Sequence, residues 1–203
     1  MQTDLFPRDS HRLQLPDADL RYCEGFLPDS PSLYARLLQE IDWRQDTITL
    51  YGRPVLIPRL NAWYGDPGAH YSYSGLALQP LPWTPALRDI KGRVESLLGE
   101  SFNSALVNLY RDGRDSVSWH SDDEYELGDE PLIASVSLGA TRRFSLRHRH
   151  DKSLDTVHLD LQDGSLLVMA GATQRHWSHQ VPKTRAAVGG RINLTFRRIL
   201  RTR

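Results

Sequence analysis

The chain has 203 residues, a length that suits one domain and allows a full-sized hydrophobic core. Its 25 Lys and Arg residues balance 25 Asp and Glu residues, which argues against a protein held to nucleic acid by bulk charge but leaves room for a local basic patch. The single cysteine, Cys23, excludes an intrachain disulfide and is typical of a reducing compartment. The polar segment 1–11 lacks the apolar core of a signal peptide, and no apolar run approaches the roughly 20 residues that span a bilayer. We therefore expect a cytoplasmic protein without a membrane association.

The first hundred residues predict two packing helices. One begins near Pro31, because Ser30 is a favourable N-cap and proline suits the first helical position. Its apolar residues fall on one face: Leu33, Leu37, Leu38 and Ile41. The other starts at Thr84-Pro85 and stops at Gly99, since glycine commonly ends a helix. Both helices are expected to pack against a larger element.

The remaining segments predict a mainly β fold. Residues 1–25 show little periodicity and are expected to form an extended lead-in, whereas residues 50–83 are rich in Gly, Pro and aromatic residues and predict short strands and exposed loops. From residue 104 onward we expect strands at 104–110, 133–138, 143–148, 155–162, 165–170, 176–181 and 191–199. Two helices followed by seven or eight short strands favour a small jelly roll or barrel.

The pair His120 and Asp122 is a candidate for metal binding. In an extended segment, residues i and i+2 lie on the same side, so both ligand atoms can reach one ion. A histidine from a distant strand would complete the two-histidine, one-carboxylate triad that is typical of non-haem Fe(II) oxygenases. The same spacing recurs at His158 and Asp160, where alternating apolar residues predict an ordinary strand with a solvated face. The spacing alone is therefore a weak indication.

The segment 191–197 carries two faces of opposite character. Its polar face consists of Arg191, Asn193, Thr195 and Arg197. One interpretation is an edge strand with a solvated polar face. The other places this face inside the barrel, where two arginines would bind the carboxylates of a diacid, because the guanidinium fork suits bidentate recognition. Asn108 and Tyr110 alternate with apolar residues and would face the same interior.

Together these motifs resemble the AlkB family of Fe(II)- and 2-oxoglutarate-dependent DNA-repair dioxygenases, closest to its duplex-acting members. The resemblance covers roughly residues 50–200 and rests on Asn108-x-Tyr110, His120-x-Asp122, His179 and the pattern R-x-N-x-T-x-R at 191–197. It implies one catalytic domain over 1–203, with an N-terminal extension of packing helices and a substrate lid (1–100) before a double-stranded β-helix core (101–203).

The resemblance also implies a ligand set. Fe(II) would be held by His120, Asp122 and His179, with 2-oxoglutarate and O2 as cosubstrates. The residues implied for 2-oxoglutarate are Asn108, Tyr110, Arg191, Asn193, Thr195 and Arg197, with Arg191 on the distal carboxylate. His176 is the alternative third ligand, because spacing does not separate it from His179. The family's ligand precedes a hydrophobic-Pro-Lys stretch, which favours His179.

The implied reaction is oxidative demethylation of N-alkylated bases in DNA, of the 1-methyladenine and 3-methylcytosine type, with release of succinate, CO2 and formaldehyde. The target base must leave the duplex to reach the metal. Residues implied for substrate binding are Tyr51, Arg59, Tyr71, Tyr73, Ser74, Asp123, Glu124 and Arg143. For the tyrosines the alternative is a place in the core, and for Asp123 and Glu124 an exposed acidic loop. A basic run could contact phosphates: Arg142, Arg143, Arg147, Arg149 and Lys152.

Two other functions remain open from the sequence. One is a dioxygenase that acts on RNA, a protein or a small molecule. The other is a non-enzymatic jelly-roll module that binds nucleic acid, or a metal for structure alone. No protein partner is indicated, and we expect a monomer.

Overall fold

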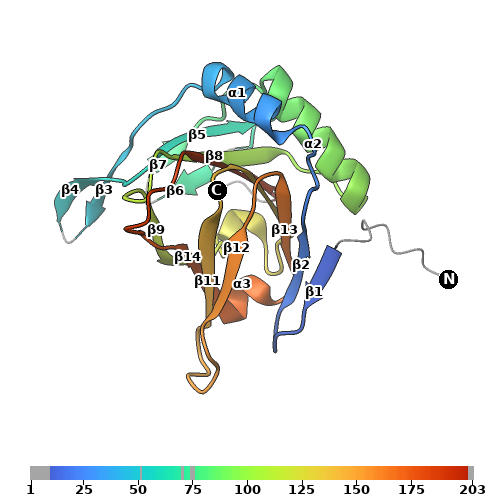
Figure 1. Ribbon diagram of the computed structural model, residues 1–203, viewed down its shortest axis with the longest axis vertical. Coiled ribbons are helices and arrows are strands. Elements are labelled where there is room, and N and C mark those ends of the chain that lie inside the picture. Colours follow the sequence, from blue (N-terminus) through green and yellow to red (C-terminus); the bar gives the residue numbers. More distant parts are fainter. Residues whose placement is uncertain (1–9, 51, 70, 74–75, 201–203) are drawn as a thin grey trace.

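The computed structural model describes residues 10–50, 52–69, 71–73 and 76–200. In this part of the chain, two antiparallel sheets face each other (Figure 1). The larger sheet has the strand order β1 (Ser10–Leu13), β2 (Asp19–Cys23), β13 (Ser165–Ala170), β10 (Ile133–Gly139), β15 (Arg191–Arg197), β8 (Ser104–Tyr110) and β5 (Leu60–Gly65). The smaller sheet has the order β12 (Val157–Leu161), β11 (Arg142–His148), β14 (Trp177–Val181) and β9 (Val117–His120).

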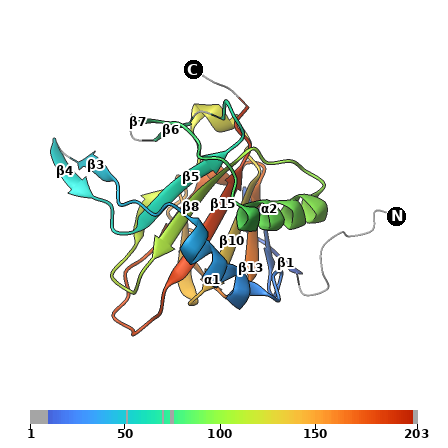
Figure 2. The same cartoon turned by 90° about the horizontal axis from the view of Figure 1, so that it is seen from above.

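Two helices cover the outer face of the larger sheet, α1 (Ser30–Glu40) and α2 (Pro85–Leu98) (Figure 2). The predicted ends of α2 are confirmed, since Thr84 Oγ1 accepts a hydrogen bond from the Leu87 amide and Gly99 adopts φ +69°. The predicted cap of α1 is wrong by one residue, because Asp29 precedes the helix. Ser30 instead donates from its hydroxyl to Asp163 Oδ2 at 2.8 Å, and so ties α1 to the loop before β13.

The apolar side chains form two main clusters on either side of the larger sheet. The outer one packs α1 and α2 against the sheet and includes Ile192, Leu194 and Phe196 of β15. The inner one lies between the two sheets and includes Phe144 and Trp177. Because side chains alternate along a strand, the polar residues of β15 must then face the interior between the sheets. β15 is therefore a central strand with a buried polar face, and not a solvated edge.

The lead-in expected at residues 1–25 is in part a pair of strands. β1 and β2 form a hairpin that extends the larger sheet beside β13. Leu20 and Tyr22 are buried in the inner cluster, while Cys23 belongs to the outer one. Tertiary pairing with β13 supplies the order that the local sequence does not indicate. The structure also contains short elements that the sequence pattern did not predict, among them β9 and the one-turn helix α3 (Thr173–His176).

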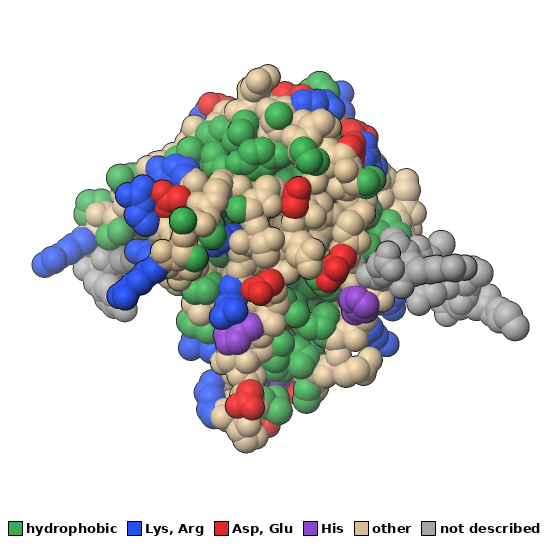
Figure 3. All heavy atoms as spheres, viewed as in Figure 1, with side chains coloured by type: hydrophobic (Ala, Val, Ile, Leu, Met, Phe, Trp, Pro, Cys, Tyr) green, Lys and Arg blue, Asp and Glu red, His purple; other side chains and the backbone are tan. Residues whose placement is uncertain are grey.

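Three further elements lie outside the two facing sheets. These are the hairpin β3 (Thr47–Leu50) and β4 (Arg53–Leu56), the hairpin β6 (Tyr71–Tyr73) and β7 (Leu76–Leu78), and the 3-10 turn η1 (Tyr125–Leu127). The β3–β4 hairpin projects from the body (Figure 1), and basic side chains are visible on this side of the molecule (Figure 3). β4 exposes Arg53, Val55 and Leu56. No helix in the described ranges is long and apolar enough to cross a membrane.

Candidate metal and cosubstrate site

His120, Asp122 and His179 converge between the two sheets. Their potential ligand atoms all lie within 4.8 Å of one another. The two histidines are partners across neighbouring strands, β9 and β14, and their ring centroids are 4.2 Å apart. A shift of register between Val117 and His120 precedes this pair on β9, and both side chains line the same cavity. Asp122 lies two residues beyond the end of β9 and is 2% exposed. The three residues that the sequence singled out are thus brought together by strand pairing.

The protonation of this group suits a metal ion. His120 Nδ1 lies 2.8 Å from the Ser118 carbonyl, which can only accept, so Nδ1 carries the hydrogen and Nε2 keeps its lone pair. Burial, helped by the nearby His120, lowers the pKa of His179 to about 3 and keeps its ring neutral. Burial alone would raise the pKa of Asp122, but the charge of Arg197 outweighs it and lowers the pKa. The set therefore offers the ring nitrogens of two imidazoles and one carboxylate.

Arg197 is the immediate neighbour of this group. Its Nη2 donates to Asp122 Oδ1 at 2.5 Å, and both side chains are almost fully buried. The other Asp122 oxygen, Oδ2, lies 4.0 Å from His179 Nε2. One carboxylate oxygen thus holds the guanidinium while the other faces the imidazoles.

A polar strip continues from Arg197 along β15 to Arg191. Strand register places Asn193 opposite Asn108, and Arg191 opposite Tyr110. Asn108, Asn193 and Arg191 line a cavity of about 40 Å³ that also includes the three candidate ligands. The Tyr110 ring instead packs against the Arg191 guanidinium, whose carbon lies 5.3 Å from the ring centroid. Asn193 is fixed by Ser135 Oγ at 2.9 Å, and Thr195 donates to Asn193 Oδ1 at 3.1 Å. All six residues implied for 2-oxoglutarate are buried on this one strip or at its end.

Arg191 is a buried cation in need of an anion. It is 1% exposed, and only its Nη2 has a hydrogen-bond partner among the described residues, Ser137 Oγ at 2.8 Å. Its Nε and Nη1 are buried without an acceptor, and burial lowers its pKa to about 10. Uncompensated burial of this kind is costly. A carboxylate at this end of the strip would satisfy both groups, so the donor set fits a diacid between Arg191 and the metal ligands.

Two contacts that the sequence did not reveal hold the loop of Asp122. Gln174 of α3 is buried, and its Oε1 accepts a hydrogen bond from the Asp122 amide at 2.9 Å. Arg149 donates from Nη1 to Asp123 Oδ2 at 2.7 Å and to the Gln174 carbonyl at 3.1 Å. α3 is therefore joined to the loop both at the ligand itself and at the next residue. These partners are distant in sequence, and no local pattern marks them.

The alternative third ligand, His176, lies in a different group. His176 closes α3, and the chain then enters β14, so it points away from the cavity that His179 lines. It joins Asp17 and His148 instead. The His-x-Asp repeat at His158 and Asp160 lies on the exposed face of β12, as expected.

The residues expected to bind substrate are only partly described. Tyr51 and Ser74 lie outside the described residues, and Tyr71 and Tyr73 are described only as backbone positions on β6. Arg59 is buried and donates to Asn108 Oδ1 at 2.7 Å, so it lies beneath the polar strip. The substrate roles of these residues stay predictions.

Most of the charged residues that were expected to contact substrate or phosphate have partners within the protein. Asp123 is exposed and bound to Arg149, while Glu124 is half-buried before η1. Arg143 is exposed on the outer face of the smaller sheet, 3.5 Å from Asp160. The expected phosphate contact of Arg142 is wrong, because this side chain is 3% exposed and donates to three backbone carbonyls, those of Asp112, Asp115 and Pro182. Local sequence gave no sign that Arg142 points inward.

Comparison with known proteins places this site in a family. The model of the 2OG-Fe(II) oxygenase superfamily matches residues 19–197. The alpha-ketoglutarate-dependent dioxygenase alkB homolog 3 of Bos taurus is 43% identical over 187 residues, which cover 87% of this chain and 65% of that protein. The DNA oxidative demethylase ALKBH2 of Mus musculus is 39% identical over 184 residues, covering 86% of this chain and 77% of that protein. The chain spans less than two thirds of the alkB homolog 3 proteins of Bos taurus, Homo sapiens and Rattus norvegicus (65%, 59% and 61%).

Solved structures share the fold. The structure of OsALKBH1 has a TM-score of 0.60 at 22% identity and covers 92% of this chain and 99% of its own. A prolyl hydroxylase from Trichoplax adhaerens, in complex with a hypoxia inducible factor peptide, has a TM-score of 0.60 at 15% identity and covers 89% and 83%. The two facing sheets and these likenesses confirm the expected double-stranded β-helix core. The family match and the relatives show that the chain belongs to the 2OG-Fe(II) oxygenase superfamily and, within it, to the AlkB family.

Proposed function

We propose that this chain is an Fe(II)- and 2-oxoglutarate-dependent dioxygenase that demethylates N-alkylated bases in DNA. The observation that carries the proposal is one continuous interior surface. It joins a two-histidine, one-carboxylate group to a buried arginine with two unsatisfied donors. A module that binds a metal only for structure has no use for the second part of this surface.

His120, Asp122 and His179 would hold Fe(II), which suits imidazole and carboxylate donors in this arrangement. When bound, it supplies the oxygen-dependent hydroxylation of an N-alkyl carbon, coupled to conversion of 2-oxoglutarate into succinate and CO2. The hydroxymethyl group on the base nitrogen then leaves as formaldehyde.

The protein's own residues orient the cosubstrate. Arg191, anchored by Ser137, would bind the distal carboxylate, since it lies at the far end of the strip from the metal ligands. Arg197 would hold Asp122 in place and face the near end of the cosubstrate. The walls of the cavity include Phe144 and Met169, which limit water around the reacting carbon.

DNA as the substrate is supported by two observations. The ALKBH2 relatives are named as DNA oxidative demethylases. In addition, the projecting β3–β4 hairpin exposes Arg53, Val55 and Leu56, which suits contact with a duplex from which a base is withdrawn. We further propose a single catalytic domain, a monomer and a cytoplasmic enzyme.

The test uses metal-stripped protein reloaded with Fe(II) and supplied with 2-oxoglutarate, O2 and an oligonucleotide that carries 1-methyladenine. We expect formaldehyde and restored adenine in equal amounts, and neither in Asp122→Asn. Formation of succinate without repair of the base would support dioxygenase activity but refute DNA as the substrate. Repair of methylated RNA in preference to DNA would support the RNA alternative. If neither succinate nor formaldehyde is formed, the proposal that the chain is an enzyme is refuted.

A further inference from the structure

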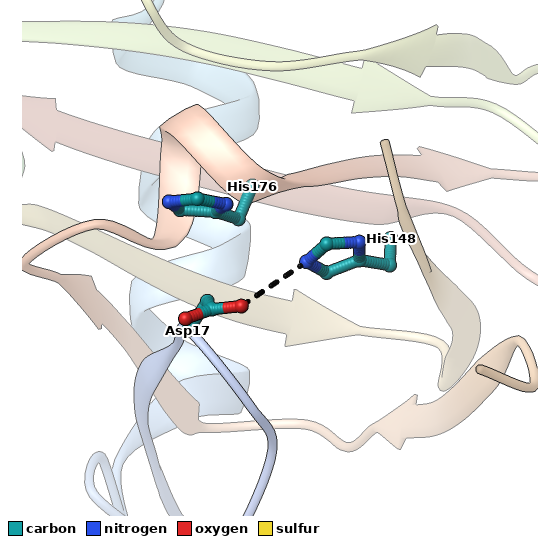
Figure 4. Close-up of side chains that lie close together, drawn as sticks. All are labelled: Asp17, His148 and His176. Atoms are coloured by element: carbon teal, nitrogen blue, oxygen red, sulfur yellow. Dashed lines mark ion pairs between the residues drawn. The ribbon is translucent and has the colours of Figure 1, made fainter. Parts of the chain in front are cut away.

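A second group of potential metal ligands lies outside the cavity described above. Asp17 comes from the turn before β2, His148 from the end of β11, and His176 from the end of α3. The three side chains lie close together, and the His148 ring is directed at Asp17 (Figure 4). Their potential ligand atoms all lie within 4.8 Å of one another. Asp17 Oδ2 is 3.5 Å from His148 Nε2. The ring of His176 is stacked on that of His148, with centroids 5.7 Å apart.

The backbone that carries these residues is fastened on both sides. Trp177 donates from Nε1 to the Pro16 carbonyl at 2.9 Å, which fixes the turn just before Asp17. The Asp19 amide donates to Thr173 Oγ1 at 2.9 Å, which fixes the turn just after it to the start of α3. The group therefore does not consist of long side chains that meet by chance at a mobile surface. Its members are held together before any ligand arrives.

His148 supplies an independent sign that the group lacks a partner. Its side chain is 5% exposed, and its Nε2 is buried without a hydrogen-bond partner in the described chain. The Asp17 oxygen is near, but not in the geometry of a hydrogen bond. Buried polar atoms without a hydrogen-bond partner are rare in folded proteins, because they destabilise the fold. This one lies beside a carboxylate and a second imidazole, which suggests that a ligand belongs there. A third imidazole, His150, stands 6.0 Å from His148 and 5.9 Å from His176 between centroids.

We propose that Asp17, His148 and His176 form a second metal site, separate from the iron site, for a divalent cation of the Zn(II) class. Imidazole and carboxylate donors suit Zn(II). Two histidines and one carboxylate leave a fourth position for water or for His150, which is exposed beside them. The ion would join the β1–β2 hairpin, β11 and α3, so its role is structural.

Metal binding at His148 requires a change of tautomer. Nδ1 of His148 accepts a hydrogen bond from the Asp151 amide at 2.8 Å, so in the neutral ring the hydrogen is on Nε2. When Nε2 binds the ion, the hydrogen moves to Nδ1, and the Asp151 amide must turn to another acceptor. Residues 151–153 are exposed, so water can take that place. The cost is about one ordinary hydrogen bond, and metal binding should therefore change the environment of the Asp151 amide.

The test is the number of Zn(II) ions bound by tag-free, metal-stripped full chain at pH 7.5, measured by calorimetry. We expect two equivalents in the unmodified protein and one in His179→Ala, where only the second site remains. In the His179→Ala background, His148→Phe and His176→Ala should each weaken that remaining site by roughly tenfold or more. His158→Ala is the matched control, since His158 also belongs to a His-x-Asp pair but lies exposed on β12, and it should change nothing.

Two further measurements separate the site from a merely structural role of these residues. Zn(II) should raise the melting temperature of His179→Ala and not that of His179→Ala/His176→Ala. It should also shift the Asp151 amide resonance in the first protein alone. A second equivalent that survives both His148→Phe and His176→Ala would place the ion elsewhere. A single equivalent in the unmodified chain, with none in His179→Ala, would overturn the proposal outright.

Discussion

Arg191 offers the sharpest test of the cosubstrate site, because its burial has opposite effects on stability and on binding. In the absence of a diacid, burial lowers its pKa from 12.5 to about 10, which corresponds to about 3 kcal/mol against the folded state. An arginine whose pKa falls on folding destabilises the folded state at every pH at which its side chain stays charged. At pH 7 the penalty is therefore complete. Arg191→Met removes the charge and keeps most of the volume, at the cost of the bond to Ser137, worth about 1 kcal/mol.

The expected net gain is about 2 kcal/mol, or roughly 4–8 °C in melting temperature for a domain of this size. The assay is thermal unfolding with Mn(II) in place of iron, with and without 2-oxoglutarate. The cosubstrate should raise the melting temperature of the unmodified protein and leave that of Arg191→Met unchanged. Arg185→Met, at an exposed loop position, is the control and should alter neither value. A variant that is less stable than the unmodified chain, or that still responds to 2-oxoglutarate, would show that Arg191 is not a cation kept for a diacid.

Three other changes test the metal ligands and their support. Asp122→Ala should abolish turnover. It also removes the carboxylate that pairs with Arg197, so the free energy of unfolding measured with urea should fall by about 3–5 kcal/mol. Asp122→Asn should also lose turnover but with a smaller loss of stability. Gln174→Ala should weaken Mn(II) binding by roughly 10–100-fold, and Gln174→Glu, which keeps an acceptor for the Asp122 amide, should recover part of it in the same titration. Because folding lowers the pKa of His179 from 6.5 to about 3, the unfolded chain takes up the proton first, so metal-free protein should lose stability as the pH falls below 6.5. Urea midpoints at pH 7 and pH 5 measure this loss, and an equal loss in His179→Asn would contradict it.

The sequence predicted those parts of the molecule in which side-chain alternation decides the outcome. Along 191–197 the apolar residues had to face one way and the arginines the other, and the structure assigns the arginines to the interior. The third ligand followed from family resemblance rather than from spacing. The structure gives the physical reason, since His176 belongs to the last turn of α3 and His179 to a strand. Because the chain changes from helix to strand between His176 and His179, the two side chains point in different directions. The periodicity of the sequence does not reveal this change.

What the sequence could not predict depends on contacts between distant segments. Gln174 meets Asp122 across 52 positions, and Ser137 meets Arg191 across 54. Arg142 looks like any member of a basic run until three carbonyls from two loops surround its guanidinium. Polar residues of this kind are unremarkable in sequence, because their role is set entirely by what packs around them.

The two groups of metal ligands differ in one hydrogen bond, and that difference predicts the order in which they fill. At His120, Nδ1 donates to a carbonyl, so Nε2 is ready to bind an ion. At His148, Nδ1 accepts from an amide, so Nε2 must first give up its hydrogen. Zn(II) added below one equivalent should therefore occupy the His120 group before the His148 group. Nitrogen chemical shifts of the imidazole rings in the metal-free protein test the cause directly. If His148 carried its hydrogen on Nδ1 there, the two sites would start from the same state, and the predicted order would lose its basis.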